Sequence, residues 1–554
     1  MKASDLFVKC LENEHVEYIF GLPGEENADL MMSLGKSKIK FILTRHEQSA
    51  AFMADVYGRL TGKPGVCLAT LGPGATNLTT GIANANMDRS RVVAITAQAQ
   101  TNALHKESHQ NMDVMAMFRP ITKWSWSFRT SDSIPEITRK AFKIATEEKP
   151  GATHIEIPVD IMKQTSRKMP VPIQKLYRFH PSNQLVKQAI KMILDAKKPL
   201  VLIGNGCIRE DAVEAVRKFV TKSGICSINT FMGKGTVSDD HDRHLQTVGI
   251  RDADYAQKAI KNTDMVITIG YDLVEYSPQS WNPELDKKII HIDFTSAETD
   301  EYYPTDMELI GDIELTIDSL LRQLEIAKQK NPSLDCYPCH KIPEIFAEIR
   351  REIVKRITQF DTDLAYPIKP EKIIGDVRKV MSNDDVVISD VGVHKLWIAK
   401  MYQTYLPNTC IIPNGFAAMG FSIPGAIAAQ MVHPDKTVIA MCGDGSFLMN
   451  VHEIETAVRL KLPIIIVVWC DAEYGLISLK QEDEFGKKVF TDFTNPDFVK
   501  LAESFNATGF FVNSTEKLSE ALQKAKLHKD RPTIIAVPVD YSRNETLLND
   551  KDRD

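Results

Sequence analysis

Two acidic residues that lie 27 positions apart are the first candidates for chemistry. Asp444 sits in a Gly-Asp-Gly-Ser turn, 443–446, directly after an apolar run, and Asp471 follows the next apolar run. Neighbouring parallel strands end at the same edge of a sheet, where open α/β sheets bind ligands. Backbone N–H groups of such a turn can hold a diphosphate. Two carboxylates, a backbone carbonyl and diphosphate oxygens would form an octahedral Mg²⁺ site, with Asp444, Asp471 and Glu473 as the predicted protein ligands.

The segments that must position these residues alternate short apolar runs with amphipathic helical patterns. This alternation predicts an α/β protein with three domains, each a doubly wound, mainly parallel sheet with helices on both faces. We place the domains at 1–165, 183–330 and 366–545, separated by a stretch rich in Lys and Pro and by a polar passage. The predicted strands are 16–20, 65–70, 92–95, 154–157, 199–203, 265–269, 288–292, 385–389, 437–441, 463–469 and 533–537.

Composition excludes several classes of partner. The 554 residues include 67 Lys+Arg and 73 Asp+Glu, a net charge of -6 that gives no basic surface for nucleic acid. The N-terminal segment is acidic and lacks an apolar run, so we expect no targeting peptide and a cytoplasmic location. Residues 401–434 carry no charged side chain, but prolines and glycines interrupt them. We therefore expect loops and a short buried helix there rather than a membrane span.

The nine cysteines show no framework spacing, and most lie in apolar runs, so we expect reduced thiols in the core. The run 336–340, Cys-Tyr-Pro-Cys-His, matches the c-type haem attachment pattern. Haem attachment requires export, and a zinc site would need a second pair of ligands. We interpret this run as part of a linker between domains.

The glycine turn and the acid that follows it resemble the signature of thiamine-diphosphate enzymes, and the resemblance extends along the whole chain. Glu47 stands where that family keeps the glutamate that protonates the aminopyrimidine ring of the cofactor, and 72–77 and 84–90 are spaced as in its pyrimidine-binding domain. Residues 390–394 resemble the diphosphate-binding loop, and Met419 the bulky residue that holds the cofactor bent. The cofactor-binding residues that the resemblance implies are Glu47, Gly392, Val393, His394, Ala417, Met419, Gly443, Asp444, Gly445, Ser446, Asp471, Tyr474, Gly475 and Ile477.

Two of these residues also have simpler interpretations: His394 as a buried structural histidine, and Met419 as a core filler. The implied cofactors are thiamine diphosphate and Mg²⁺. Within the family the chain most resembles acetolactate synthases, and among these the catabolic, flavin-free type. That similarity lies in 109–123, 269–276 and 537–542, and in Asp471, where most relatives have asparagine.

Flavin-binding relatives carry a His-Gly pair and an Arg-Phe-Asp-Asp-Arg run in the central domain. Here the corresponding positions, 249–252 and 271–275, read Gly-Ile-Arg-Asp and Tyr-Asp-Leu-Val-Glu. We therefore expect no FAD.

The resemblance implies decarboxylation of pyruvate and ligation of the product to a second pyruvate, which gives 2-acetolactate and CO₂. Related 2-keto acid decarboxylases, which release an aldehyde, carry a His-His pair in the first domain and a glutamate six residues after the second metal ligand. Here the pair reads His109-Gln110 and the later position is Ile477, so ligation is favoured. Gln110 could hydrogen-bond the acceptor or an intermediate. A decarboxylase and a catalytically silent cofactor-binding regulator remain the alternatives.

The implied catalytic residues are Glu47, Gln110, Met419 and Lys480. Lys480 departs from the pattern, because synthases that prefer 2-ketobutyrate have tryptophan there and catabolic ones glutamine. Its ammonium could hold an acceptor carboxylate or point into solvent. The implied partners are small 2-keto acids and further copies of the chain, because the two cofactor-binding domains of one chain do not normally close a site together. We expect a homodimer at minimum and a homotetramer as the assembly.

Overall fold

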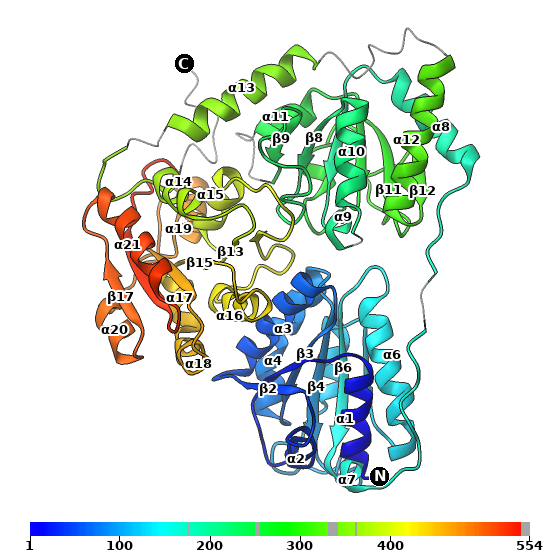
Figure 1. Ribbon diagram of the computed structural model, residues 1–554, viewed down its shortest axis with the longest axis vertical. Coiled ribbons are helices and arrows are strands. Elements are labelled where there is room, and N and C mark those ends of the chain that lie inside the picture. The colour runs from blue at the N-terminus through cyan, green and yellow to red at the C-terminus, as the bar shows by residue number, and fades with distance from the viewer. Residues whose placement is uncertain (175–176, 210, 250–254, 331–341, 360–362, 545–554) are drawn as a thin grey trace.

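Three parallel six-stranded sheets, each covered by helices, form the molecule (Figure 1). The computed structural model describes residues 1–174, 177–209, 211–249, 255–330, 342–359 and 363–544. Every pairing between the named strands is parallel, as the alternation of strands and helices predicted. The chain is therefore an α/β protein with three sheets, in agreement with the predicted fold class.

The first sheet has the strand order β2-β1-β3-β4-β6-β5. Its strands are β1 (Tyr18–Gly21), β2 (Lys40–Leu43), β3 (Gly65–Ala69), β4 (Val92–Gln98), β5 (Trp124–Ser127) and β6 (Ala152–Pro158). Its helices are α1 (Ala3–Asn13), α2 (Ala28–Leu34), α3 (Glu47–Thr61), α4 (Pro73–Met87), α5 (Val114–Phe118), α6 (Ile134–Thr146) and α7 (Val159–Lys163). The central strands β3, β4 and β6 are buried along their whole length, because helices cover both faces.

The second sheet has the order β12-β11-β10-β7-β8-β9. Its strands are β7 (Pro199–Ile203), β8 (Cys226–Asn229), β9 (His244–Thr247), β10 (Met265–Ile269), β11 (Lys288–Asp293) and β12 (Met307–Ile310). Its helices are α8 (Asn183–Asp195), α9 (Gly206–Arg209), α10 (Val213–Ser223), α11 (Tyr255–Lys261) and α12 (Ile313–Lys330).

A further helix, α13 (Glu344–Gln359), lies within the passage that the sequence analysis treats as polar. It buries Phe346, Ile349 and Ile353 in the same apolar cluster as Leu200 of β7. The passage therefore contributes to the core of the second sheet. The Cys-Tyr-Pro-Cys-His run at 336–340 lies outside the described residues.

The third sheet has the order β14-β13-β15-β16-β18-β17. Its strands are β13 (Val386–Ser389), β14 (Cys410–Ile411), β15 (Val438–Gly443), β16 (Ile465–Cys470), β17 (Thr508–Phe511) and β18 (Thr533–Pro538). Its helices are α14 (Pro370–Val380), α15 (Val393–Met401), α16 (Ser422–Val432), α17 (Asp444–Met449), the short turn η5 (Val451–Glu453), α18 (Ile454–Arg459), α19 (Gly475–Phe485), α20 (Phe498–Ser504) and α21 (Thr515–Leu527).

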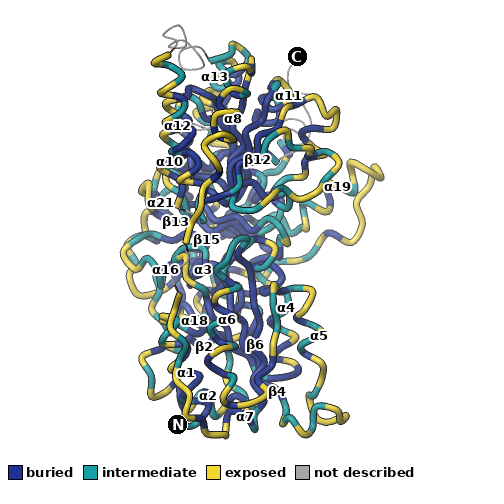
Figure 2. Tube along the Cα trace, turned by 90° about the vertical axis from the view of Figure 1, so that its right-hand side faces the viewer, coloured by how far each residue is buried: buried dark blue, intermediate teal, exposed yellow. Residues whose placement is uncertain are grey.

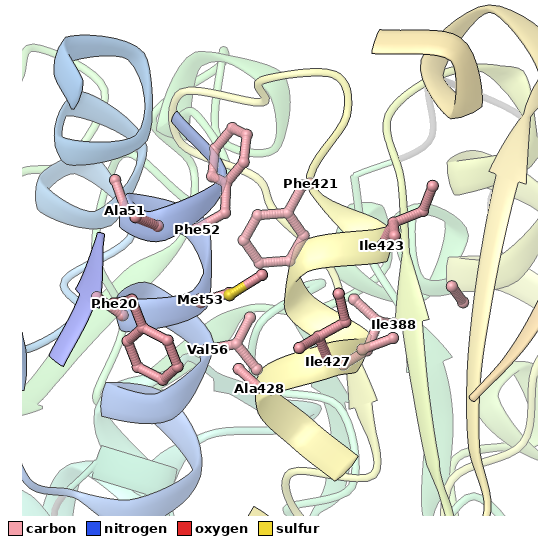
Figure 3. Close-up of a cluster of buried hydrophobic side chains, with 14 of the residues drawn as sticks. Phe20, Ala51, Phe52, Met53, Val56, Ile388, Phe421, Ile423, Ile427 and Ala428 are labelled. Atoms are coloured by element: carbon pink, nitrogen blue, oxygen red, sulfur yellow. The ribbon is translucent and has the colours of Figure 1, made fainter. Parts of the chain in front are cut away.

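The first and third sheets are joined by a shared apolar core between α3 and α16 (Figure 3). Phe52 and Phe421 meet edge to face with ring centroids 5.5 Å apart. Gly425 allows the close approach, because a Cβ there would lie 3.1 Å from Cγ2 of Val56. The uncharged stretch 401–434 thus contains a short buried helix between loops, as expected.

Burial is concentrated in the strands, which run as a dark band through the centre of the molecule, while exposed residues lie on the outer helices and loops (Figure 2). Among the described residues, no helix is long and apolar enough to cross a membrane. The seven cysteines in the described part of the chain are all free, and six of them are buried, in line with the expected reduced thiols.

Candidate active site

Asp444 and Asp471 lie side by side at the ends of the neighbouring strands β15 and β16. Gly443 pairs with Trp469 in the strand register, so each acid follows its strand at the same edge. The Asp444 carboxylate is buried, and its Oδ2 accepts hydrogen bonds from the backbone N–H groups of Asp471, at 3.0 Å, and Ala472, at 2.7 Å. The structure therefore brings together the two acids that the sequence analysis paired.

The electrostatics of this pair favour a bound cation. Burial, followed by the charges of Asp444 and Glu473, raises the pKa of Asp471 to about 8. Two carboxylates that face each other away from water repel, and a divalent cation between them would remove the repulsion. Within the described part of the chain, no three His, Cys, Asp or Glu side chains form a cluster able to hold a metal. The donor set therefore fits Mg²⁺ only with backbone and diphosphate oxygens added, as the sequence analysis proposed.

Glu473 is placed so that its side chain is engaged elsewhere. Its carboxylate accepts hydrogen bonds from Nζ of Lys488, at 2.8 Å, and from Oγ1 of Thr491, at 3.1 Å. This leaves the backbone carbonyl of Glu473 as the oxygen that could reach a metal.

The glycines of the two predicted diphosphate-binding segments make close approaches that a larger residue would block. A Cβ on Gly392, whose φ is +155°, would lie 2.7 Å from the His394 ring, and one on Gly445 would lie 2.8 Å from the Tyr474 ring. A Cβ on Gly475 would lie 3.5 Å from Val393. The segments at 390–394, 443–446 and 474–475 thus meet in one cradle.

His394 supplies an unpaired polar atom at this cradle. Its Nε2 is buried and has no hydrogen-bond partner, and the ring also lies 3.3 Å from where a Cβ on Gly443 would stand. Burial lowers the pKa of His394 to about 3, so the ring is neutral. A neutral imidazole beside a glycine turn fits a phosphate oxygen, which can accept a ring N–H. Ser446 completes the turn by donating its hydroxyl to the carbonyl of Gly443 at 3.0 Å.

The loop that carries Ala417 and Met419 is tied to the same cradle by Asp390. The buried carboxylate of Asp390 accepts hydrogen bonds from the N–H groups of Gly420, at 2.9 Å, and Ser422, at 2.8 Å. Ala417 has a φ of +55°, in the left-handed region. Met419 is half-buried on this loop, two residues after Ala417.

Glu47 and Gln110 lie near each other at one end of α4 in the first domain. The Glu47 carboxylate, at the first position of α3, is only 8% exposed and accepts a hydrogen bond from Nδ2 of Asn77 at 2.9 Å. A Cβ on Gly74 would lie 3.3 Å from Oε1 of Glu47, and one on Gly72 would lie 2.8 Å from the carbonyl oxygen of Gln110. Asn77 lies in the segment 72–77, but the sequence predicted no role for it.

Other predicted residues are not brought together within one chain. Among the described residues, Glu47 forms no hydrogen bond or ion pair with the third domain. Tyr474, directly before α19, and Ile477 and Lys480, on α19, are exposed. The two segments that correspond to the flavin motifs lie in the central domain. In one of them Asp272 pairs with Arg89 of the first domain at 2.8 Å, and most of the other falls within 250–254, outside the described residues.

Three polar side chains with contacts at this site were missed from the sequence. Asn495 binds Asp444, while Asn450 and Glu453 contact the segment that begins α3. Each is a single polar residue without a motif or a spacing signal, so only the folded chain reveals its contact.

Three models of thiamine pyrophosphate enzyme domains match the chain. The N-terminal TPP binding domain matches residues 1–117, the central domain 186–320 and the C-terminal TPP binding domain 390–537. The chain therefore belongs to the thiamine pyrophosphate enzyme family, and it has the cofactor-binding domains of that family.

Among curated proteins, the chain is similar over nearly its whole length to acetolactate synthases. It is 36% identical to the acetolactate synthase of Bacillus subtilis, over 99% of this chain and 95% of that protein. It is 34% identical to a probable acetolactate synthase large subunit of Methanococcus aeolicus, over 98% and 92%. It is 32% identical to the catabolic acetolactate synthase of Raoultella terrigena, over 98% and 96%. These identities are too similar to separate the catabolic type from the others.

Proposed function

We propose that this chain uses thiamine diphosphate and Mg²⁺ to decarboxylate pyruvate and to join the product to a second pyruvate, giving 2-acetolactate and CO₂. The observation that carries the proposal is the pair of Asp444 and Asp471 at the cradle, together with the buried Glu47, in a chain 36% identical to an acetolactate synthase. These residues retain the acid and the metal ligands that the reaction requires.

Each group has a role that its surroundings support. Bound thiamine diphosphate supplies a carbon nucleophile and stabilises the electron pair left when CO₂ departs. Asp444 and Asp471 hold Mg²⁺, and the N–H groups of 443–446 bind the diphosphate. His394 donates a hydrogen bond from its neutral ring to the diphosphate. Glu47 holds and returns a proton at the pyrimidine ring, in a site where burial excludes bulk water.

Met419 would hold the cofactor bent, because the residue that follows it, Gly420, is fixed through both of its backbone groups. The N–H of Gly420 donates to Asp390 at 2.9 Å, and its carbonyl accepts from Nδ2 of Asn450 at 2.8 Å. In that role Met419 would position the cofactor for the loss of the proton that activates it. A flexible thioether on a fixed loop can pack against both rings.

Ligation is favoured over aldehyde release because position 477 offers no acid. Release of an aldehyde would need a proton donor at the site, and Ile477, exposed on α19, carries none. Gln110 can donate a hydrogen bond to an acceptor keto acid but cannot supply a proton. The alternative of a 2-keto acid decarboxylase would need a donor from elsewhere.

We also propose that the enzyme is of the catabolic, FAD-independent type, on the strength of Asp471 and of the motifs at 109–123 and 269–276. Two positions of the expected flavin region carry groups that are already paired: Asp272 with Arg89, and Glu275 with Thr230. The purified protein should be colourless. A yellow preparation with one FAD per chain would contradict this assignment.

A homodimer at minimum, and a homotetramer as the full assembly, is part of the proposal. Among the described residues, the Glu47 carboxylate forms no hydrogen bond or ion pair with the cradle of its own chain. Apolar side chains around that cradle stand exposed: Phe416 at 47%, Tyr474 at 38% and Ile477 at 51%. Exposed apolar groups beside a site are typical of a surface that a partner covers. Sedimentation of the cofactor-loaded protein would test this, and a monomer with full activity would contradict it.

The decisive experiment is to incubate the purified protein with thiamine diphosphate, Mg²⁺ and pyruvate and to measure CO₂, acetolactate and acetaldehyde together. We expect two pyruvates to be consumed for each CO₂ released, with acetolactate as the product. One acetaldehyde for each CO₂ would support the decarboxylase. Cofactor binding without any CO₂ would support the silent regulator.

A further inference from the structure

The side chain of Asn495 makes a short contact with the buried Asp444. Its Nδ2 donates a hydrogen bond to Oδ2 of Asp444 at 2.6 Å. The same oxygen accepts the N–H groups of Asp471 and Ala472, so three donors converge on Oδ2. In the part of the chain that the structure describes, the other oxygen, Oδ1, accepts one hydrogen bond, from the N–H of Gly445 at 2.8 Å. The amide cannot be turned round, because its oxygen would then face a carboxylate oxygen.

Asn495 is held in place by contacts with 472–474, the segment that follows the predicted metal ligand Asp471. The segment 491–495 runs antiparallel to 472–474: the N–H of Tyr474 donates to the carbonyl of Thr491, and the N–H of Phe493 to that of Ala472, both at 3.0 Å. The rings of Tyr474 and Phe493 pack with centroids 5.0 Å apart. The position of Asn495 therefore follows from contacts with the loop that carries Asp471.

We propose that Asn495 is a positioning residue for the metal ligand Asp444. This inference rests on the proposed function, because it takes Asp444 to be a Mg²⁺ ligand. Mg²⁺ requires nearly ideal octahedral geometry, so it binds best to a carboxylate whose orientation is already set. Three donors on Oδ2 leave Oδ1 to face the metal. Mutation of a residue that hydrogen-bonds to a metal ligand typically lowers metal affinity by about 10–100-fold.

Two variants separate hydrogen-bond donation from shape. Asn495→Ala removes the side chain, whereas Asn495→Asp keeps its shape and replaces the donor with an acceptor. Thr494→Ala, an exposed neighbour, is the matched control. Calorimetric titration of each protein with Mg²⁺ in the presence of thiamine diphosphate gives the Mg²⁺ concentration at half-saturation. We expect both Asn495 variants to need about tenfold more Mg²⁺ or more, with Thr494→Ala unchanged.

Activity provides a second readout. A positioning defect should be recovered by excess Mg²⁺, so the kcat of Asn495→Ala at saturating Mg²⁺ should approach that of the unaltered enzyme while the KM for pyruvate stays the same. Circular dichroism without ligands checks the fold. If Asn495→Asp does not fold, Asn495→Leu takes its place, since it has similar volume and no donor.

The outcomes separate this inference from the function on which it rests. Unchanged Mg²⁺ dependence in Asn495→Ala would overturn the positioning role. So would unchanged Mg²⁺ dependence in Asn495→Asp, or in Asn495→Leu where that variant replaces it. Asp444→Ala is measured alongside. If it too leaves Mg²⁺ dependence unchanged, the metal site is misplaced and the proposed function loses its support. If it abolishes Mg²⁺-dependent cofactor binding while the Asn495 variants behave normally, only the role of Asn495 is wrong.

Discussion

Glu453 of the third domain accepts hydrogen bonds from the backbone N–H groups of Arg45, at 2.9 Å, and His46, at 3.1 Å, in the first. Its side chain is fully buried, and its second oxygen accepts the hydroxyl of Thr456 at 2.6 Å. A second hydrogen bond joins the same two domains: the hydroxyl of Ser49 donates to Oδ1 of Asn450 at 3.0 Å. The third domain therefore holds the backbone directly before Glu47.

Removing this link should loosen Glu47 without touching the cofactor cradle. Glu453→Ala removes the acceptor of the N–H groups of Arg45 and His46, which costs up to about 1–3 kcal/mol for a donor that water cannot reach. We expect a lower Tm and a kcat reduced by about tenfold, with nearly unchanged affinity for thiamine diphosphate. Glu455→Ala, on a partly exposed ion pair, is the control. A variant with normal kcat would show that Glu47 needs no support from the third domain.

Glu47→Gln keeps the size of the side chain and removes the group that exchanges a proton. The cofactor should still bind, while turnover falls by roughly 10²-fold or more, the usual scale for a lost acid-base group. Calorimetry for cofactor binding and CO₂ release for turnover measure the two effects separately. The exposed Glu25→Gln serves as the comparison. Near-normal turnover of Glu47→Gln would refute the assignment.

Lys480 should matter little for the acceptor. The side chain is exposed on α19, and a solvated contact with a carboxylate is worth under about 1 kcal/mol. Lys480→Gln should therefore change the KM for the acceptor by less than about threefold, as should the exposed Lys487→Gln. CO₂ and acetolactate are measured separately in each. A tenfold rise in KM, with CO₂ release kept and acetaldehyde replacing acetolactate, would instead assign Lys480 to the acceptor.

Stability should depend on pH through Glu275 in the central domain. Burial, opposed by a hydrogen bond from Thr230, raises the pKa of Glu275 to about 7. Between the ordinary value of 4.5 and 7, the unfolded chain loses a proton that the folded chain keeps, so the free energy of unfolding falls as pH rises. Glu275→Gln has no such proton and should gain stability relative to the parent by pH 8, on the order of 3 kcal/mol at most.

The Tm of both proteins at pH 5 and pH 8 measures this difference. At pH 5 the parent carries a neutral acid, so the two should be close in Tm. The exposed Glu284→Gln, which keeps Glu275, should match the parent at both pH values. A gap between Glu275→Gln and the parent that is equal at both pH values would contradict the raised pKa.

Local patterns determined the centre of each sheet but not its edges. Of the twelve inner strands, eleven were predicted, with β8 as the exception, whereas none of the six outer strands, β2, β5, β9, β12, β14 and β17, was predicted. Inner strands are buried on both faces and read as continuous apolar runs. Most outer strands are only partly buried, so their composition is that of a loop. The helix α13 was missed for a similar reason, because its three buried side chains are spaced among charged residues.

The sequence by itself determined the pairing of Asp444 with Asp471, since a turn after each of two apolar runs places both acids at one sheet edge. It also indicated each of the glycine segments, 390–394, 443–446 and 474–475, because the residue types within one segment are adjacent in the chain, but only the fold brings the three segments together. Only the tertiary structure decided the partners of these groups. Asn495 lies 51 positions from Asp444, and Glu453 lies 408 positions from Arg45. A single polar side chain has no periodicity, and its partner is set by the packing of distant segments, within one domain for Asn495 and between two domains for Glu453.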